Sequence, residues 1–177
     1  MPRLKGERVL LRPFREEEAD QVWRISRSGV DGFMPDPRRP TKRAIAKRVE
    51  RSGQLVDGRL DLAIEAEGRL VGEIDARQPK GALPQGVFEF GIAVYDRDDR
   101  GKGFGEQAVW LLTRHLFEAE RAERVQATTD VENRPMRGVL EKLGFAFEGV
   151  LRAYGYGDDG RRDYAMYAMT RSDHERG

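Results

Sequence analysis

A glycine-rich turn between a strand and a helix constrains the fold of this chain more than any other stretch. The segment DRDDRGKGFGEQAVWLL, residues 96–112, places Gly101, Gly103 and Gly105 at alternate positions between a charged cluster and a helical pattern. The run before it, GVFEFGIAVY, and the run RVQATTDV at 124–131 both favour β-strands. The order strand, helix, strand predicts a central parallel βαβ unit.

The remaining elements add antiparallel strands around this unit. LDLAIEA and RLVGEIDAR, joined by Glu67-Gly68, alternate as a hairpin, and the two runs that flank residues 157–160 predict a terminal hairpin. Four segments carry helical spacing: residues 15–26, 41–56, 104–119 and 133–143. We therefore expect an α/β (α+β) fold in a single domain over residues 1–177, with a mixed, mostly antiparallel twisted sheet of about six to seven strands flanked by about four helices.

Charge and composition exclude several classes of function. Lys and Arg total 32 against 31 Asp and Glu, so we expect no basic field for nucleic acid or anionic lipid. No window approaches the roughly 18 apolar residues of a membrane span, and the first residues do not show the apolar core of a signal peptide. We therefore expect a cytoplasmic protein with no membrane partner. Without cysteine, and with only His115 and His174 as histidines, we also expect no metal site.

The glycine turn does not fit three well-known loops. A nucleotide P-loop needs Ser or Thr after its lysine, but Gly103 follows Lys102. A dinucleotide-binding fingerprint would follow an early strand, whereas this turn lies in mid-sequence. An EF-hand would need a glutamate where Gln107 stands, so Asp99 and the aspartates near it are interpreted as a solvated turn.

An anion site at the glycine turn is nevertheless physically reasonable. Converging N–H groups, the positive end of a helix dipole and missing Cβ atoms let an anion approach closely. Arg100 and Lys102 add mobile positive charge. The alternative is that the glycines only form a tight connection between strand and helix. Three glycines with two interleaved cations favour an anion, for which a pyrophosphate fits best, and a nucleotide-phosphate protein is a further interpretation.

Three segments, in the right order, resemble the GNAT superfamily of acyl-CoA N-acyltransferases. Arg100-x-x-Gly103-x-Gly105 matches that family's R/Q-x-x-G-x-G/A signature. NRPMRGVLEKLGF resembles its N-x-x-[AS]-x-x-x-[LY]-E-K-x-G-F segment, and GDDGRRDYAMYAM is similar to the ending of the ribosomal-protein N-terminal acetyltransferase branch. The resemblance covers nearly the whole chain. It implies the GNAT fold and acetyl-CoA as co-substrate, which would bring the thiol that a chain without cysteine cannot supply.

The resemblance also implies a cofactor-binding role for several residues. Amides of the glycine turn would cradle the pyrophosphate, the preceding strand would pair with the pantetheine arm, and the N–H of Val94 would polarise the thioester carbonyl. Asn133 resembles the family asparagine that bonds the pantetheine arm, although a helix N-cap is an equally good role for it. The expected cofactor-binding residues are Ile92, Ala93, Val94, Arg100, Gly101, Lys102, Gly103, Phe104, Gly105, Glu106 and Asn133.

The catalytic groups are harder to assign. Glu89, just before the cofactor-binding strand residues, is the candidate base that takes the amine proton, directly or through water, and its alternative is a plain solvent-facing strand residue. Leu140 and Met136 stand where the family often places Tyr and Ser, and neither can donate a proton. Tyr154 is therefore the candidate acid for the leaving thiolate, with packing or substrate binding as its alternative.

The sequence thus predicts an enzyme that moves an acetyl group from acetyl-CoA directly to a primary amine, in a ternary complex. The acceptor would be a protein N-terminus or a small-molecule amine, with Phe33, Met34 and Tyr156 as substrate residues. The alternative is a non-catalytic acyl-CoA-binding module of the same fold. The acceptor, the acyl chain length and the oligomeric state stay open, and a homodimer is the assembly to consider.

Two groups outside the expected site receive structural interpretations. Arg43, Lys47, Arg48 and Arg51 are interpreted as a solvated helix face. Trp23, Trp110 and Phe117 have helical spacing and are expected in the core.

Overall fold

The computed structural model describes residues 1–28, 40–78, 84–157 and 160–177. They form two units: the first contains Met1–Arg77 and Gly91–Leu112, and the second contains Gln78–Phe90 and Thr113–Gly177. Strand β5 (Val87–Val94) and helix α3 (Phe104–Glu118) each contribute residues to both units. Among the helices described, none has the length and apolar character that crossing a membrane requires.

Antiparallel strands build the first unit. They are β1 (Leu4–Lys5), β2 (Leu10–Arg12), β3 (Arg59–Ala66) and β4 (Arg69–Arg77), with the second half of β5 next in order. β3 and β4 form the expected hairpin, in which Asp61 pairs with Asp75. Glu67 and Gly68 both have positive φ, 52° and 77°, as a two-residue type I′ turn requires.

Two helices, α1 (Ala19–Ser28) and α2 (Lys42–Arg51), contact each other and cover one face of these strands. A 3₁₀ turn at Glu16–Glu18 leads into α1, and Thr41 caps α2 by accepting a hydrogen bond from the amide of Ala44. The core beneath the helices consists of Phe14, Val22, Ile45, Val49, Ala63, Leu70 and Tyr95. Ala93 packs against the same cluster, so the side chains of Ile92 and Val94 point to the opposite face of β5.

The second unit has the strand order β5, β6 (Arg124–Asp130), β8 (Gly160–Thr170) and β7 (Ala146–Gly157). β5 and β6 run parallel, with Phe88 opposite Val125, while β6 with β8 and β7 with β8 are antiparallel. The strand–helix–strand order around the glycine turn therefore forms the parallel pair that the sequence predicts. Gly149 and Gly155 mark the two irregularities of the terminal hairpin.

Helices α4 (Arg134–Lys142) and α5 (Arg171–Arg176) belong to the second unit. Asn133 caps α4, and α4 ends before Gly144, which has a φ of 86° that favours glycine. Within this unit Phe90 meets Phe145 edge to face, with ring centroids 5.9 Å apart. Leu140 and Tyr167 are both completely buried.

The fold class is confirmed, with small differences in the count of elements. The described residues contain eight strands and five helices, because the short strand β1 and the short helix α5 add to the elements expected. Trp110 corrects one expectation, since its side chain is 45% exposed, whereas Phe117 is buried and Trp23 packs partly against the core. Tertiary structure, which helical spacing does not reveal, decides which apolar residues of a helix are covered.

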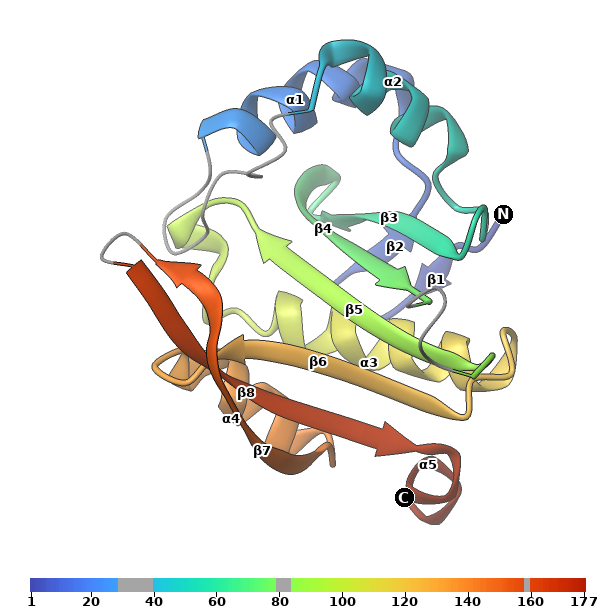
Figure 1. The fold of residues 1–177 in the computed structure, drawn as a ribbon. Coiled ribbons are helices and arrows are strands. Elements are labelled where there is room, and N and C mark those ends of the chain that lie inside the picture. Colours follow the sequence, from blue (N-terminus) through green and yellow to red (C-terminus); the bar gives the residue numbers. More distant parts are fainter. Residues whose placement is uncertain (29–39, 79–83, 158–159) are drawn as a thin grey trace. The chain divides into compact units, whose positions relative to one another are not determined.

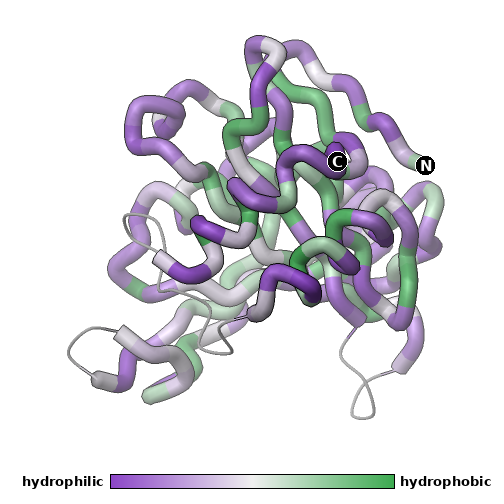
Figure 2. The backbone as a smooth tube through the Cα atoms, turned by 90° about the horizontal axis from the view of Figure 1, so that it is seen from above, coloured by the Kyte–Doolittle hydropathy of each residue, from purple (hydrophilic) through white to green (hydrophobic). Residues whose placement is uncertain are grey.

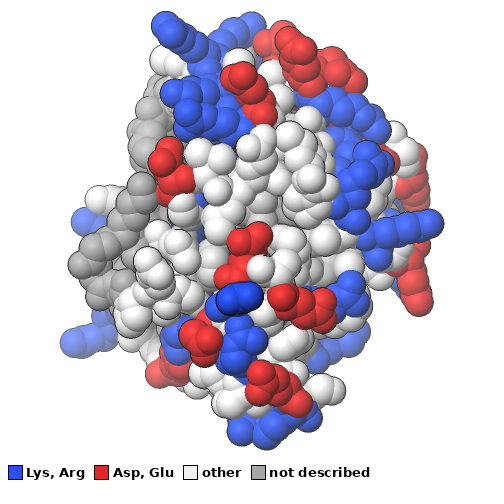
Figure 3. All heavy atoms as spheres, turned by 90° about the vertical axis from the view of Figure 1, so that its right-hand side faces the viewer, with Lys and Arg blue, Asp and Glu red and all other residues white. Residues whose placement is uncertain are grey.

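Polar residues are spread along the whole chain. Figure 2 shows short hydrophobic stretches separated by hydrophilic ones, in keeping with a mean hydropathy of −0.70. Acidic and basic side chains alternate over the face drawn in Figure 3, so this face shows no extended field of one sign. An anion site on such a protein has to be built locally.

Candidate active site

The glycine turn begins helix α3 with unusual backbone geometry. Gly101 and Gly103 have φ values of 74° and 81°, in the left-handed region that side chains with a Cβ rarely adopt. The amide of Gln107 donates to the carbonyl of Gly103 at 3.0 Å, which closes the first helical turn. The amides before that bond have no helical acceptor and lie at the positive end of the helix dipole. The turn thus offers backbone donors to an anion.

The third glycine lies where the start of the helix packs against the strand. A Cβ built on Gly105 would stand 3.8 Å from both Ile92 Cδ1 and Val94 Cγ2. The start of α3 therefore packs against the second half of β5, within one unit. This contact brings together the two segments that the sequence assigns to coenzyme A, and larger side chains at Gly105 would push them apart.

The expectation of a solvated turn is confirmed for Asp96 and Asp98, which are exposed, and is wrong for Asp99. Its side chain is only 2% exposed, and Arg69 donates to both of its carboxylate oxygens, at 2.6 and 2.7 Å. The Lys102 ammonium lies 3.3 Å from the same carboxylate. The hydrogen bonds from Arg69 hold the pKa of Asp99 below its ordinary value. The turn is thereby tied to the first residue of β4.

The two cations of the turn are also held more firmly than the sequence suggests. Arg100 directs Nε and Nη2 at the carbonyl of Val94, at 3.4 and 3.3 Å, and Lys102 is paired with Asp99. A cavity of about 440 Å³ adjoins Lys102, and it is lined by Arg69, Asp96, Arg97, Asp98, Asp99 and Lys102. In this structure both groups thus contact the turn's own backbone or side chains, and their role toward an anion stays a prediction.

Arg8 and Gln107 meet at the same turn, and neither is a predicted site residue. Arg8 Nη1 donates to the carbonyl of Lys102 at 2.8 Å. The side-chain oxygen of Gln107 accepts from the amides of Arg8 and Val9, at 2.7 and 2.9 Å. The bonded residues are more than 90 positions apart, so no local pattern in the sequence could reveal the contact.

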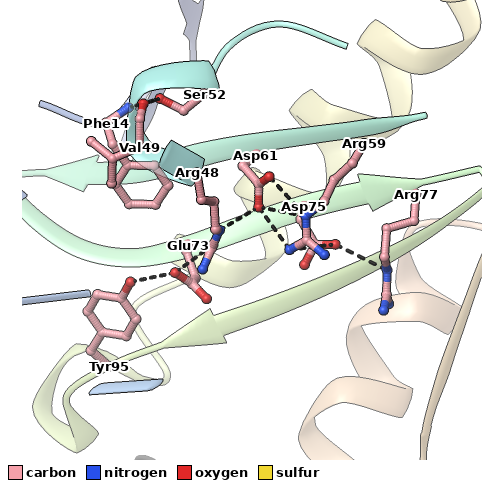
Figure 4. A network of polar contacts seen from close by, with 10 residues as sticks. All are labelled: Phe14, Arg48, Val49, Ser52, Arg59, Asp61, Glu73, Asp75, Arg77 and Tyr95. Carbon is pink, nitrogen blue, oxygen red and sulfur yellow. Dashed lines mark hydrogen bonds and ion pairs between the residues drawn. The ribbon is translucent and has the colours of Figure 1, made fainter. Parts of the chain in front are cut away.

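A buried ionic network lies on the α2 side of the same unit. Arg48 corrects the expected solvated helix face, because it turns inward to Asp61 at 2.7 Å and Glu73 at 2.9 Å (Figure 4). Tyr95 donates its hydroxyl to Glu73 at 2.9 Å. We call the set Arg48, Arg59, Asp61, Glu73, Asp75, Arg77 and Tyr95 the α2 network. It links α2 to β3, to β4 and to the residue that follows β5.

Each carboxylate of the α2 network faces at least one arginine, and the arginines are shared between carboxylates. Burial opposes ionisation of Asp61, but hydrogen bonds from Arg59 and the charge of Arg48 bring its pKa below the ordinary value. Burial raises the pKa of Asp75, because Arg59 and Arg77 offset it only partly at 3.5 and 3.2 Å. Burial and the nearby charge of Glu73 raise the pKa of Tyr95 well above its ordinary value. The Tyr95 phenol is therefore neutral at physiological pH.

The remaining predicted groups lie in the second unit. Glu89 is half-buried on β5 and accepts a hydrogen bond from Gln126 at 3.2 Å, so it is not a plain solvent-facing residue. Asn133 accepts from the amide of Met136 and donates to Thr129 Oγ1 at 3.0 Å. The N-cap role of Asn133 is thus confirmed, and its role toward pantetheine stays a prediction.

Both candidate tyrosines are exposed on β7. Tyr154 is 52% exposed and lies against the ring of Tyr164, while Tyr156 is 60% exposed beneath the guanidinium of Arg161. These positions do not assign either tyrosine a reaction. Phe33 and Met34 lie outside the described residues.

The residues present fit coenzyme A better than a metal. Two glycines at positive φ, a third where α3 packs against β5, and helix amides without helical acceptors form a cradle that extra Cβ atoms would fill. Within the ranges that the structure describes, no group of three or more His, Asp or Glu side chains could hold a metal ion.

Comparison with known proteins places this geometry in a family. The model of the "Acetyltransferase (GNAT) domain" matches residues 8–146. The SPbeta prophage-derived uncharacterized N-acetyltransferase YokL of Bacillus subtilis (strain 168) is 30% identical over 114 residues, which are 64% of this chain and 63% of that protein. The chain therefore spans less than two thirds of that relative.

Two further matches agree with this one. The uncharacterized N-acetyltransferase p20 of Bacillus licheniformis is 31% identical over 78 residues, 44% of either protein. The structure of Mycobacterium smegmatis RimJ in complex with CoA-disulfide superimposes with a TM-score of 0.74 at 26% identity, and the match covers 93% of this chain and 83% of that one. With a family model that spans both units and the glycine turn, the chain belongs to the GNAT acetyltransferase family.

Proposed function

We propose that the protein transfers an acetyl group from acetyl-CoA directly to a primary amine, in a ternary complex and without a covalent enzyme intermediate. The observation that carries this proposal is the glycine turn, where Gly101 and Gly103 at positive φ begin α3 beside Ile92 and Val94. The binding of CoA-disulfide by the M. smegmatis relative supports a donor of the same kind. We also propose that residues 1–177 act as a single catalytic domain.

Two segments of the first unit, the end of β5 and the glycine turn, bind the donor under this proposal. Acetyl-CoA, when bound, supplies the acetyl group and a thiolate leaving group. The amides of residues 101–106 hold its pyrophosphate, whereas the Arg100 amide already donates to the carbonyl of Arg97 at 3.0 Å. The backbone of Ile92–Val94 pairs with the pantetheine arm as an added strand would. The N–H of Val94 stabilises the negative charge that develops on the carbonyl oxygen. Arg100 keeps this strand end in place through the Val94 carbonyl.

Proton transfer falls to the second unit and to water. Glu89 accepts the proton of the attacking amine, directly or through water, while Gln126 orients its carboxylate. The carbon–nitrogen bond forms as the carbon–sulfur bond breaks, and the thiolate takes a proton from Tyr154 or from solvent. Asn133 supports the pantetheine arm from the start of α4, and Tyr156 contributes to acceptor binding together with Phe33 and Met34.

Amine basicity ranks the acceptors. Holding a lysine-like amine of pKa ~10.4 neutral at pH 7 costs ~4.6 kcal/mol, whereas an α-amine of pKa ~8 costs only ~1 kcal/mol. A peptide N-terminus or an amino acid is therefore the less demanding acceptor. A lysine-like amine would require a stronger base or a site that disfavours its ammonium form.

An acceptor panel tests the proposal. The protein is mixed with acetyl-CoA and N-terminal peptides, polyamines or aminoglycosides, and the free thiol is followed with time. We expect thiol release with at least one acceptor, and α-amines to react best. Binding of CoA without thiol release from any acceptor would instead indicate a non-catalytic acyl-CoA-binding module. Preferential binding of ATP or GTP over CoA would indicate a nucleotide-phosphate protein.

A variant of Glu89 separates binding from chemistry. Glu89→Gln should lower kcat by about 100-fold and leave the Kd for CoA unchanged, because only proton transfer is affected. Glu132→Gln, an exposed carboxylate of the same unit, is the matched control. Equal activity of the two variants would remove Glu89 from the mechanism.

A further inference from the structure

The turn between β1 and β2 holds the glycine turn from the side. The amide of Gly6 donates to the carbonyl of Val9 at 2.9 Å, which closes the loop at residues 6–9. The Gln107 side chain enters this loop, where one oxygen accepts from two successive amides, those of Arg8 and Val9. A Cβ on Gly6 would collide with the Gln107 carboxamide, so a larger residue here would displace that side chain from the loop. The loop is thus built around a residue of α3.

Arg8 extends the same contact to the glycine turn itself. Its Nη1 atom donates to the carbonyl of Lys102 at 2.8 Å. Both Nη1 and Cδ of Arg8 would lie 3.7 Å from a Cβ built on Gly103. The guanidinium therefore lies on the turn, between two residues assigned to coenzyme A. Arg8 is nevertheless exposed, and a guanidinium has five N–H donors, of which this bond uses one.

This arrangement has an electrostatic consequence for an anion at the turn. A carbonyl oxygen carries partial negative charge and would repel a phosphate that approaches the neighbouring amides. The hydrogen bond from Arg8 fixes the Lys102 carbonyl and offsets its negative potential. The same guanidinium adds a full positive charge beside the cradle, while Lys102 is paired with the buried Asp99.

We propose that Arg8 is a phosphate-binding and positioning residue of the donor site, which it serves by holding the Lys102 carbonyl and by donating to the pyrophosphate of coenzyme A. The proposal rests on the proposed function, because it needs coenzyme A at the glycine turn. Gln107 supports Arg8 by fixing the backbone from which its side chain projects.

Calorimetric titration of CoA and of 3′-dephospho-CoA into the intact protein tests this proposal. The variants are Arg8→Gln, Arg8→Lys and the control Arg43→Gln, which removes an exposed arginine from α2 in the same unit. The Tm of each ligand-free variant is measured in parallel. Titrations at low and high salt report whether the lost affinity is electrostatic, because screening weakens an exposed charge interaction.

Arg8→Gln should bind both CoA and dephospho-CoA about 10-fold more weakly than Arg43→Gln, with a shallower salt dependence. Arg8→Lys keeps the charge and one donor, so its affinity should lie between those of Arg8→Gln and the wild type. An equal loss for both ligands assigns the contact to the pyrophosphate. A loss confined to CoA would contradict that assignment, since only CoA carries the 3′-phosphate.

Two other outcomes would overturn the proposal. Affinity of Arg8→Gln equal to that of Arg43→Gln would show that the contact does not contribute to binding. If Arg8→Gln has a lower Tm than the wild type, its weaker binding could reflect damage to the fold, and Arg8→Lys is then compared. CoA binding by Arg8→Lys as weak as that by Arg8→Gln would contradict a role for the positive charge. Failure of the wild type to bind CoA would instead refute the proposed function, and that result is visible before any variant is compared.

Discussion

The α2 network and the glycine turn lie in the same unit and use charge in opposite ways. In the α2 network, Arg48 is 19% exposed and faces Asp61 and Glu73, which are 9% and 26% exposed. At the glycine turn the side chains of Lys102 and Arg69 stay nearly half exposed, and only Asp99 is buried. The network turns its charges toward each other, whereas the turn leaves backbone amides available.

We therefore expect the α2 network to contribute to folding stability and the glycine turn to contribute to ligand binding. A buried ion pair that loses one partner leaves an uncompensated charge, so damage to the α2 network should appear as loss of folding free energy. A glycine turn depends on backbone φ values, so damage there should appear mainly as loss of ligand affinity. Substitutions in each region test this separation, beginning with the largest effect.

Removal of Arg48 should be the most destabilising change. Arg48→Met keeps the aliphatic length but leaves Asp61 and Glu73 without their shared partner, and it should lower the free energy of unfolding by about 3 kcal/mol. Urea unfolding measures the loss. Arg43→Met, on the exposed side of the same helix, is the control. A difference below about 1 kcal/mol between the two variants would show that the network does not stabilise the unit.

Gly103→Ala should weaken binding of CoA about 10-fold, because the strained turn no longer aims its amides at the pyrophosphate. Gly68→Ala is the matched control, since Gly68 has a φ of 77° against 81° at Gly103, and a Cβ added to Gly68 would meet no atom within 4 Å. Both variants should lose a similar folding free energy of about 1 kcal/mol. Calorimetry measures the affinity of both variants for CoA. Equal affinities would show that the glycine turn does not contribute to CoA binding.

The cross-strand pair Asp61 and Asp75 tests the balance inside the α2 network. The lowered pKa of Asp61 means that its ionised form stabilises the fold above about pH 4, so Asp61→Asn should lose about 1.5 kcal/mol at pH 7. The raised pKa of Asp75 means that stability is lost as pH rises through its folded value. Asp75→Asn should therefore stay within about 0.5 kcal/mol of the wild type. A reversed order in urea unfolding at pH 7 would contradict these directions.

A small effect is also expected at Asp99. Its pKa is lowered by Arg69, so the ion pair stabilises the fold above the ordinary value of about 4 and is lost as pH falls through the lower folded value. Asp99→Asn should cost about 0.5 kcal/mol at pH 7, because Arg69 is half exposed and screened by water. The difference from the wild type should shrink below about pH 4. A difference that is constant with pH would rule out an electrostatic origin.

Most elements of the fold could be predicted because their signals are local. The hairpin around Glu67 and Gly68, the cap at Thr41 and the stop before Gly144 each depend on a few adjacent residues. The parallel pair of β5 with β6 follows from element order alone. Short elements such as β1 escaped prediction, because two residues carry no periodic pattern.

The candidate site was predictable where it consists of backbone and not where it consists of side-chain pairs. Glycines at alternate positions indicate an unusual backbone from the sequence alone. The inward turn of Arg48 was not predictable, because a basic helix face in the sequence does not show which arginine meets two carboxylates from other strands. The burial of Asp99 likewise depends on Arg69, 30 residues away.

The sequence by itself determined the order of strands and helices, the glycine turn at the start of α3 and the family to which the chain is similar. Only the tertiary structure decided which charges are buried. It also placed Arg8 against the Lys102 carbonyl of the glycine turn and directed the Arg100 guanidinium to the Val94 carbonyl at the end of β5. The physical reason is the distance along the chain over which each interaction acts. Backbone conformation follows from neighbouring residues, whereas the partner of a charged side chain is set by packing between segments that are distant in the chain.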